Sequence, residues 1–318
     1  MEYRRLGKSG LKVSAIALGS WLTYGTVTER EASMACVKQA YELGINHFDC
    51  ANVYGATPHA AEVVLGEALR PYRRESYVLT SKAFWPVGEG PNDRGLSRKH
   101  LFAQVDESLR SLGTEYLDIF YCHRFDSETD LEETLRALDD LVRAGKILYA
   151  GISEWPANQI AAATSLQKQL GLHAIAASQP VYNMFQRYIE TAVLPICDDA
   201  GIGQVVFSPL AQGVLTGKYR LGRPIPEGSR AHTERVKHFV ERYLNEATLK
   251  KVEGLLDVAS EVGLSLSQLA IAWTLRLPSV SSALIGASRP EQVIENVKGV
   301  GVALSEEILQ KIDRILSA

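Results

Sequence analysis

Four side chains capable of acid–base chemistry follow three apolar runs in the first part of the chain. The side chains are Asp49, Tyr54, Lys82 and His123. The runs, which predict short strands, are Ile45–Phe48, Tyr77–Thr80 and Leu117–Tyr121. If these strands are neighbours in a parallel sheet, their carboxyl ends bring the four side chains to one edge.

These residue types suit proton transfer to an oxygen atom. The pKa of a phenol is near 10, too high for efficient acid–base work at neutral pH. A nearby ammonium stabilises the phenolate, and a carboxylate keeps that ammonium charged in a low-dielectric pocket, so we assign these roles to Lys82 and Asp49 around Tyr54. His123 can donate a hydrogen bond that orients a substrate oxygen. The set predicts protonation of a carbonyl oxygen while a hydride reaches the carbon.

Strand-like runs recur along the whole chain with amphipathic segments between them. The expected strands are Ser14–Leu18, Ile45–Asp49, Tyr77–Lys82, Leu117–Cys122, Ile147–Gly151, Ile175–Ser178, Val205–Ser208 and Ser281–Ile285. Eight such alternations favour an α/β fold, a (β/α)8 TIM barrel, over the full length 1–318 as one domain. Residues 2–13 predict a hairpin across the barrel's bottom, and a long loop insertion, expected to be a functional flap, separates the seventh and eighth strands.

A doubly wound sheet is the structural alternative. If it bound a dinucleotide, it would place a GxGxxG turn after its first strand, but the residues there are Leu18-Gly-Ser-Trp21. Helix starts are expected as capping boxes at Thr28–Glu31 and Ser265–Gln268, and at Asp130. Gly44, Gly145 and Gly171 are expected just past helix ends.

Composition narrows the function classes. Charged residues make up 22% and hydrophobic residues 46%, and the net charge of −3 gives no reason to expect nucleic acid or a membrane surface as partner. No apolar stretch approaches the roughly 20 residues of a membrane helix, and the N-terminus lacks a signal-peptide core, so a cytoplasmic location is expected. The four cysteines are widely spaced and are expected to be buried, reduced thiols.

At these motifs the chain resembles the aldo-keto reductase family. The run Phe48–Gly55 is similar to the family signature, with Asp49 and Tyr54 at its Asp and Tyr positions, and the family's Lys and His fall on Lys82 and His123. The resemblance extends over essentially the whole chain, from Arg5 to Gln292. It implies a barrel enzyme that uses NADPH to reduce aldehydes and ketones to alcohols.

Within the family the chain is most similar to the β subunits of voltage-gated potassium channels and their bacterial relatives. The segments Arg94–His100, Tyr182–Arg187 and Leu269–Trp273 carry this similarity. The alternative function is therefore a redox-sensing regulatory subunit with bound NADP(H). In the animal subunits the His position is generally Asn, so His123, together with the lack of a long N-terminal extension, favours an enzyme. Cys50 is a further departure, because the family usually has Thr there.

A third class, a barrel isomerase or hydrolase without redox chemistry, would need a metal-ligand cluster or paired carboxylates. The sequence contains no HxH or clustered acidic arrangement, so no metal is expected. Partners are expected to be a small carbonyl substrate and, as in channel-type relatives, possible further copies of the chain in a tetramer or larger homo-oligomer.

The NADP(H) contacts come mainly from the resemblance. They are Ser153 and Gln179 for the nicotinamide amide, Phe207 for its ring, and Ser208, Pro209, Leu210, Ala211, Gly213 and Lys218 for the pyrophosphate. The adenosine end is assigned to Gly286, Ser288, Arg289, Gln292, Glu295 and Asn296, with Arg230 as a second basic contact on the insertion. Pro290 suits a first helical position, and that helix start offers N–H groups to a 2′-phosphate beside Arg289.

Substrate contacts are expected from the loops after the strands. Trp21, Tyr24 and Trp85 suggest an apolar wall for an aromatic or short aliphatic aldehyde. Arg124 is either a contact for an anionic aldehyde or a solvated charge, and the sequence leaves both open.

Overall fold

A barrel of eight parallel strands forms the centre of the molecule in the computed structural model, which describes residues 1–26 and 28–317. The strands are β3 (Ile16–Gly19), β4 (His47–Asp49), β5 (Val78–Ala83), β6 (Leu117–Cys122), β7 (Ile147–Ser153), β8 (Ile175–Gln179), β9 (Gly203–Phe207) and β10 (Val280–Gly286). Pairing of β10 with both β9 and β3 closes the barrel. The predicted (β/α)8 fold is therefore confirmed, and the open doubly wound sheet is excluded.

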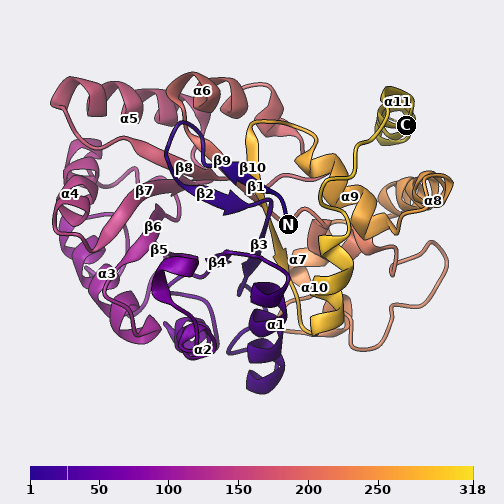
Figure 1. Cartoon of the computed structure of the whole chain (residues 1–318), viewed down its shortest axis with the longest axis horizontal. Helices are drawn as coiled ribbons and strands as arrows, with labels where there is room; N and C mark the ends of the chain where they lie inside the picture. The colour runs from indigo at the N-terminus through magenta and orange to yellow at the C-terminus, as the bar shows by residue number, and fades with distance from the viewer. Residues whose placement is uncertain (27, 318) are drawn as a thin grey trace.

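Helices surround the strands in a ring (Figure 1). They are α1 (Arg30–Glu42), α2 (Ala60–Leu69), α3 (Arg98–Leu112), α4 (Leu131–Arg143), α5 (Ala157–Leu170), α6 (Val193–Ala200), α9 (Leu266–Leu275) and α10 (Pro290–Val297). α4 shows why these segments fold as helices: Leu135, Leu138 and Leu141 recur at helical spacing and are all buried. The helix α11 (Glu306–Ser317) packs against α8 (Glu246–Glu261) outside this ring (Figure 1).

The expected helix ends are mostly found. Ser265 and Gln268 form the capping box that opens α9, and the Asp130 side chain accepts from the Glu132 N–H at 2.7 Å at the start of α4. Gly44, Gly145 and Gly171 have positive φ values of 83°, 71° and 65° just after their helices.

The capping box predicted at Thr28 is wrong. The helix α1 begins at Arg30 with Glu29 as its N-cap, and no side chain caps it. The Thr28 backbone N–H donates instead to the Thr23 carbonyl at 3.1 Å, which holds Thr28 in the preceding loop.

The N-terminal hairpin lies across one opening of the barrel, as predicted (Figure 1). Its strands β1 (Tyr3–Arg5) and β2 (Lys12–Ser14) are antiparallel. Leu6 and Val13 are fully buried and pack against apolar side chains inside the barrel, among them Val78 and Ile119. Asp49, Lys82 and His123 lie at the other end of the barrel, at or just after the carboxyl ends of β4, β5 and β6.

The segment between β9 and β10 is only partly the loop that the sequence suggested. It contains the short helices η3 (Ala211–Thr216), η4 (Arg230–His232) and α7 (His238–Glu241), followed by the regular helices α8 and α9. α9 is buried along its whole length and packs on β10, so it is a helix of the barrel ring. The irregular part of the insertion precedes α8.

No single helix in the described residues is both long and apolar enough to cross a membrane. Taken together, α8 and α9 reach the required length and apolarity, but the two helices are bent by 88° relative to each other.

Candidate active site

A buried ion pair joins the ends of β4 and β5. Lys82 Nζ lies 2.5 Å from Asp49 Oδ2 and donates to the Cys50 carbonyl at 2.7 Å, and both charged side chains are fully buried. The second oxygen of Asp49 accepts from Thr80 Oγ1 at 2.7 Å and from Gln179 Nε2 at 2.9 Å. Buried charges persist only when paired and hydrogen-bonded, and both groups meet that condition here.

Tyr54 and His123 lie next to this pair. The Lys82 ammonium is 4.9 Å from the centre of the Tyr54 ring, and the Tyr54 hydroxyl is 3.4 Å from His123 Nε2. Tyr54 comes from the loop after β4, and His123 directly follows β6. The structure thus brings together the four side chains that the sequence singled out.

The electrostatics of the site keep Tyr54 protonated. Burial raises the pKa of Tyr54 well above 10, the charge of Asp49 raises it further, and Arg124 lowers it. The sequence analysis expected the Lys82 ammonium to favour the phenolate, but burial, the largest effect on the Tyr54 pKa, keeps the phenol protonated, and Asp49 adds to it. Burial lowers the pKa of His123 well below 6.5, and Lys82 and Arg124 lower it further. Near neutral pH the site therefore holds a neutral phenol and a neutral imidazole.

A turn with unusual backbone conformation follows β9. Ser208, Ala211 and Gln212 have positive φ values of 56°, 46° and 59°, and Gly213 has 96°. Ser208, Ala211 and Gln212 are half of the six non-glycine residues with positive φ in the described chain. Strained backbone of this kind concentrates at functional sites. Within the turn the Ala211 N–H donates to the Ser208 carbonyl at 3.0 Å, and the Gly213 N–H donates to the Leu210 carbonyl at 2.8 Å.

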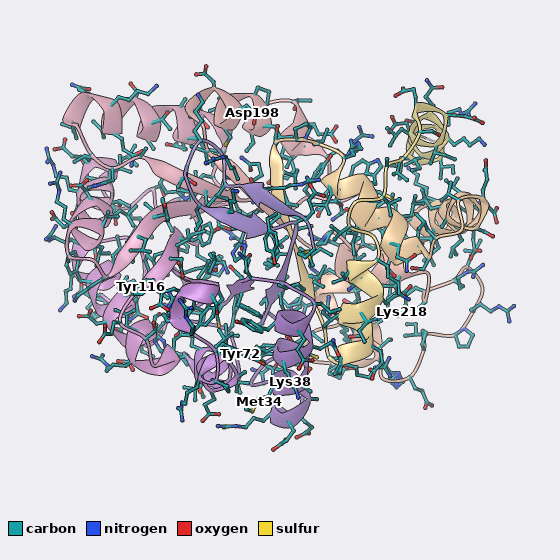
Figure 2. All side chains as sticks on the ribbon, in the orientation of Figure 1. Met34, Lys38, Tyr72, Tyr116, Asp198 and Lys218 are labelled. Atoms are coloured by element: carbon teal, nitrogen blue, oxygen red, sulfur yellow. The ribbon has the colours of Figure 1, made fainter. Side chains whose placement is uncertain are left out.

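Three cations gather near this turn. Burial lowers the pKa of Lys218, and the charges of Arg230 and Arg289 lower it further, so both arginines lie near this lysine. Lys218 lies on the same side of the molecule as α10 (Figure 2). Arg230 donates to the Gln212 side chain, and none of the ion pairs found in residues 1–26 and 28–317 includes any of the three cations. Cations without carboxylate partners suit an anionic ligand.

The start of α10 faces the same region. Arg289 is the N-cap and Pro290 occupies the first helical position, as the sequence predicted. Within this segment Gln292 accepts from the Ser288 N–H at 2.8 Å, and Glu295 accepts from Gln268 Nε2 at 2.9 Å. Gly286 is exposed at the end of β10, and Asn296 is buried.

The residues assigned to the nicotinamide end contact or border the candidate catalytic cluster, which consists of Asp49, Tyr54, Lys82 and His123. Ser153 Oγ donates to the Gln179 carbonyl at 2.8 Å, while the Gln179 side chain bonds to Asp49. The ring of Phe207, at the end of β9, lies edge-on to Trp21 with centroids 6.1 Å apart. These residues therefore border the catalytic cluster rather than lie scattered through the core.

Aromatic side chains flank the catalytic cluster on two sides. The Trp21 ring is 6.4 Å from that of Tyr54, and the Trp85 ring is 6.4 Å from that of His123. The Arg124 guanidinium lies 5.4 Å from the Trp85 ring centre. Arg124 also donates to the His123 carbonyl at 2.6 Å, which holds it at the site.

Two details of this wall differ from the sequence analysis. Tyr24 is only 1% exposed and belongs to the main hydrophobic core, so we leave it out of the proposed substrate wall. Phe239 of α7 packs on Trp21 with ring centroids 4.9 Å apart, and the sequence analysis missed it. The length of the insertion was a signal that something reaches the site, but no local pattern marked Phe239.

Comparison with known proteins agrees with this geometry. The model of the aldo/keto reductase family, described as "Aldo/keto reductase family", matches residues 15–317. The chain belongs to the aldo/keto reductase family. It is therefore related to oxidoreductases that act on carbonyl compounds.

Similar proteins of this family carry two kinds of name. A "Probable voltage-gated potassium channel subunit beta" of Oryza sativa is 42% identical, covering 100% of this chain and 97% of that protein. The corresponding protein of Arabidopsis thaliana is 43% identical with the same coverage. The "L-glyceraldehyde 3-phosphate reductase" of Escherichia coli K12 is 40% identical, covering 99% of this chain and 92% of the relative. The expected resemblance to the channel-subunit branch is thus confirmed.

The thiols of this aldo/keto reductase are all buried and free. Burial raises the pKa of the Cys50 thiol far above its usual value, and Cys50 Sγ lies 3.0 Å from Ser20 Oγ. A thiol that stays protonated and inaccessible is a poor nucleophile. Across the described residues, no group of three or more His, Cys, Asp or Glu side chains is arranged to hold a metal ion.

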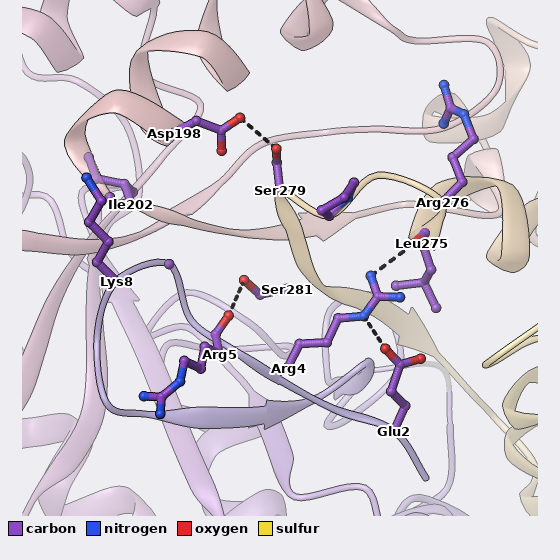
Figure 3. Close-up of a pocket in the computed structure, with 13 residues that line it drawn as sticks. Glu2, Arg4, Arg5, Lys8, Asp198, Ile202, Leu275, Arg276, Ser279 and Ser281 are labelled. Atoms are coloured by element: carbon purple, nitrogen blue, oxygen red, sulfur yellow. Dashed lines mark hydrogen bonds and ion pairs between the residues drawn. The ribbon is translucent and has the colours of Figure 1, made fainter.

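A large groove lies at the other end of the reductase, beside the hairpin (Figure 3). Its volume is about 740 Å³, and basic residues including Arg4 line it. Arg4 is already engaged, because it donates to the carbonyls of Leu275 and Val280 at 2.9 Å each and pairs with Glu2. These contacts tie the hairpin to the end of α9 and the start of β10, so Arg4 has a structural role.

Proposed function

We propose that the protein reduces aldehydes or ketones with NADP(H), with Tyr54 as the proton donor. The observation that carries this proposal is the position of the Tyr54 hydroxyl, 3.4 Å from His123 Nε2 and beside the buried Lys82–Asp49 pair. Reduced nicotinamide, when bound, supplies the hydride to the carbonyl carbon. The chain's own residues bind the carbonyl oxygen and protonate it.

The two neutral groups can share one oxygen. Donors that lie 3.4 Å apart can both reach a carbonyl oxygen at hydrogen-bond distance, provided the Nε2 nitrogen of His123 carries its hydrogen. Negative charge that develops on that oxygen is stabilised by both donors. Tyr54 then gives up its proton, and the resulting phenolate lies next to the Lys82 ammonium. Asp49 keeps Lys82 charged and in place.

The donor set fits a dinucleotide with an additional phosphate. Lys218, Arg230 and Arg289 provide three positive charges near the strained turn Ser208–Gly213, without carboxylate partners in the described chain. We assign the pyrophosphate to the turn and Lys218, and the 2′-phosphate to Arg289 at the start of α10. Ser153, Gln179 and Phe207 would hold the nicotinamide end.

The substrate we favour is a short aldehyde that carries an anionic group. Trp21, Trp85 and Phe239 provide apolar surface around the catalytic cluster, while Arg124 provides a positive charge held close to His123. Arg124 has no ion-pair partner in the part of the chain that the structure describes. The name of the Escherichia coli relative, which specifies a phosphorylated aldehyde, supports the same class.

A second candidate is a regulatory subunit that binds NADP(H) and senses its redox state. The names of the plant relatives favour it. His123 favours turnover instead, because its imidazole, within reach of the Tyr54 hydroxyl, gives a carbonyl oxygen a second hydrogen-bond donor.

One experiment separates the two candidates. The purified protein is mixed with NADPH and, separately, 4-nitrobenzaldehyde, methylglyoxal, glyceraldehyde and glyceraldehyde 3-phosphate, and loss of NADPH absorbance is followed. Multiple-turnover oxidation of NADPH supports the reductase. Tight NADPH binding without turnover of any of the four aldehydes would instead favour the regulatory subunit.

A further inference from the structure

The loop that carries Tyr54 ends at a strained residue. His59 is the N-cap of α2 and adopts the left-handed conformation, with φ 66° and ψ −4°. A residue with a β-carbon is disfavoured there, and a glycine would adopt the same backbone without cost. Surrounding contacts must therefore hold His59 in this conformation.

A buried carboxylate holds the His59 side chain. Glu62 Oε2 lies 2.6 Å from His59 Nδ1, and Glu62 Oε1 accepts from Ser81 Oγ. The Glu62 side chain is fully buried, and His59 is its only ion-pair partner in the described chain. A buried carboxylate needs such partners to offset its desolvation. Through Glu62, the start of α2 is bonded to Ser81 on β5. Ser81 immediately precedes Lys82 on β5.

The first turn of α2 in turn supports the Tyr54 loop. The Ala61 N–H donates to the Tyr54 carbonyl at 3.0 Å, and the His59 N–H donates to the Asn52 carbonyl at 2.6 Å. Asn52 is itself tied to the Lys82 carbonyl at 3.2 Å. The space is tight, because a β-carbon on Gly55 would lie 2.7 Å from that of Ala60. A shift of this helix start would therefore move Tyr54 relative to Lys82.

We propose that His59 and Glu62 are positioning residues, which fix the first turn of α2 on β5 and so set the Tyr54 hydroxyl against Lys82 and His123. Neither side chain is bonded to the hydroxyl, so both act through the loop. The predicted effect on kcat rests on the proposed reductase function. A hydroxyl displaced by about an ångström loses much of its rate advantage while cofactor and substrate still bind.

The decisive variant is His59→Gly. It relieves the left-handed strain but removes the contact with Glu62, so a purely conformational role predicts unchanged or improved behaviour. We expect kcat to fall about tenfold, whereas KM and the Kd of NADPH change less than about twofold. The solvent deuterium isotope effect on kcat should rise, because proton transfer from a misplaced Tyr54 becomes more rate-limiting. Unchanged kcat in His59→Gly, with an active parent, overturns the inference and leaves the reductase proposal intact.

A second measurement does not depend on catalysis. Hydrogen–deuterium exchange of the full-length protein should be faster in peptides covering residues 52–61 of His59→Gly than in the parent. The matched control is His173→Gly, which removes another histidine–carboxylate contact, 2.7 Å from Asp139, near the start of β8 at the opposite end of the barrel. It should leave both kcat and exchange in residues 52–61 unchanged. Equal exchange in parent and His59→Gly also overturns the inference, even if no aldehyde is reduced.

Glu62→Gln tests the same contact from its other partner. It retains an acceptor for Ser81 and removes the charge opposite His59. The double variant with His59→Gly should lose no more rate than the worse single variant, because both changes break one contact. Additive losses would mean that the two residues act separately, which contradicts the proposal.

Discussion

Lys82 Nζ lies 2.5 Å from Asp49 Oδ2, with both side chains fully buried inside the barrel. Such a pair is weak support for fold stability, since desolvation of both charges offsets most of their attraction. The position of the Lys82–Asp49 pair beside Tyr54 points instead to a role in the candidate site. It places an ammonium 4.9 Å from the ring of Tyr54, whose phenol burial keeps protonated.

Removing the Tyr54 hydroxyl tests this arrangement directly. Tyr54→Phe keeps the ring beside Lys82, so NADPH should bind as in the parent, while kcat should fall by a factor of roughly 10² or more, the scale of lost general-acid catalysis. Tyr24→Phe is the control. Tyr24 is a buried tyrosine outside the candidate site, and its hydroxyl has no hydrogen-bond partner in the described chain. Steady-state rates and NADPH titration check both variants. A Tyr54→Phe enzyme as fast as its parent would exclude Tyr54 as the donor.

The cation cluster predicts a preference for NADPH over NADH. A charge-assisted hydrogen bond to the 2′-phosphate contributes about 1.5–3 kcal/mol, so Arg289→Ala should weaken NADPH binding roughly tenfold to a hundredfold and leave NADH binding nearly unchanged. Quenching of protein fluorescence by each cofactor measures this. Lys250→Ala on α8, where the exposed Lys250 pairs with Glu246, should change neither Kd. Equal weakening for both cofactors would contradict the assignment of Arg289 to the phosphate.

The meeting of the candidate catalytic residues could be predicted from sequence because barrel topology is regular. Once successive strands are neighbours, Asp49, Lys82 and His123 must meet at the carboxyl ends of β4, β5 and β6. The hairpin and the start of α10 followed from local signals, a turn sequence in residues 2–13 and Pro290 at a first helical position. Local rules were sufficient wherever one strand end or one helix cap decided the outcome.

Tertiary contacts decided the rest. Tyr24 follows β3 as a pocket residue would, but its side chain enters the core, a direction that spacing does not encode. Phe239 reaches Trp21 through the insertion, over a long sequence separation. The rise in the Tyr54 pKa depends first on burial and then on the Asp49 charge, and residue types alone do not reveal how deeply the phenol is buried.

Acid should destabilise the protein through His47. Burial lowers the pKa of His47 to about 4, and neither ring nitrogen has a hydrogen-bond partner in the described chain. The unfolded chain, with a His pKa near 6.5, therefore takes up the proton first, so stability is present above that pH and is lost as pH falls toward 4. Between pH 7 and pH 5 this contribution is roughly 2 kcal/mol of the free energy of unfolding.

Urea unfolding at the two pH values checks the His47 contribution. His47→Gln should reduce the loss of stability between pH 7 and pH 5 by that amount. His232→Gln, at an exposed histidine, should leave the loss as in the parent. An unchanged pH dependence in His47→Gln would mean that other groups cause it, among them His123, whose pKa is lowered in the same direction.

Arg124 should determine the preference for anionic aldehydes. Arg124→Gln should lower kcat/KM for glyceraldehyde 3-phosphate about tenfold or more relative to glyceraldehyde, as expected for a lost charge-assisted hydrogen bond. The ratio of the two substrates is the informative quantity, because the Arg124 charge also lowers the pKa of Tyr54 and of His123 and thus affects both reactions. Arg98→Gln, which removes an exposed arginine paired with Asp140, is the control and should leave the ratio unchanged. If Arg124→Gln slows both substrates by the same factor, Arg124 acts on the catalytic groups and not on the substrate's anion.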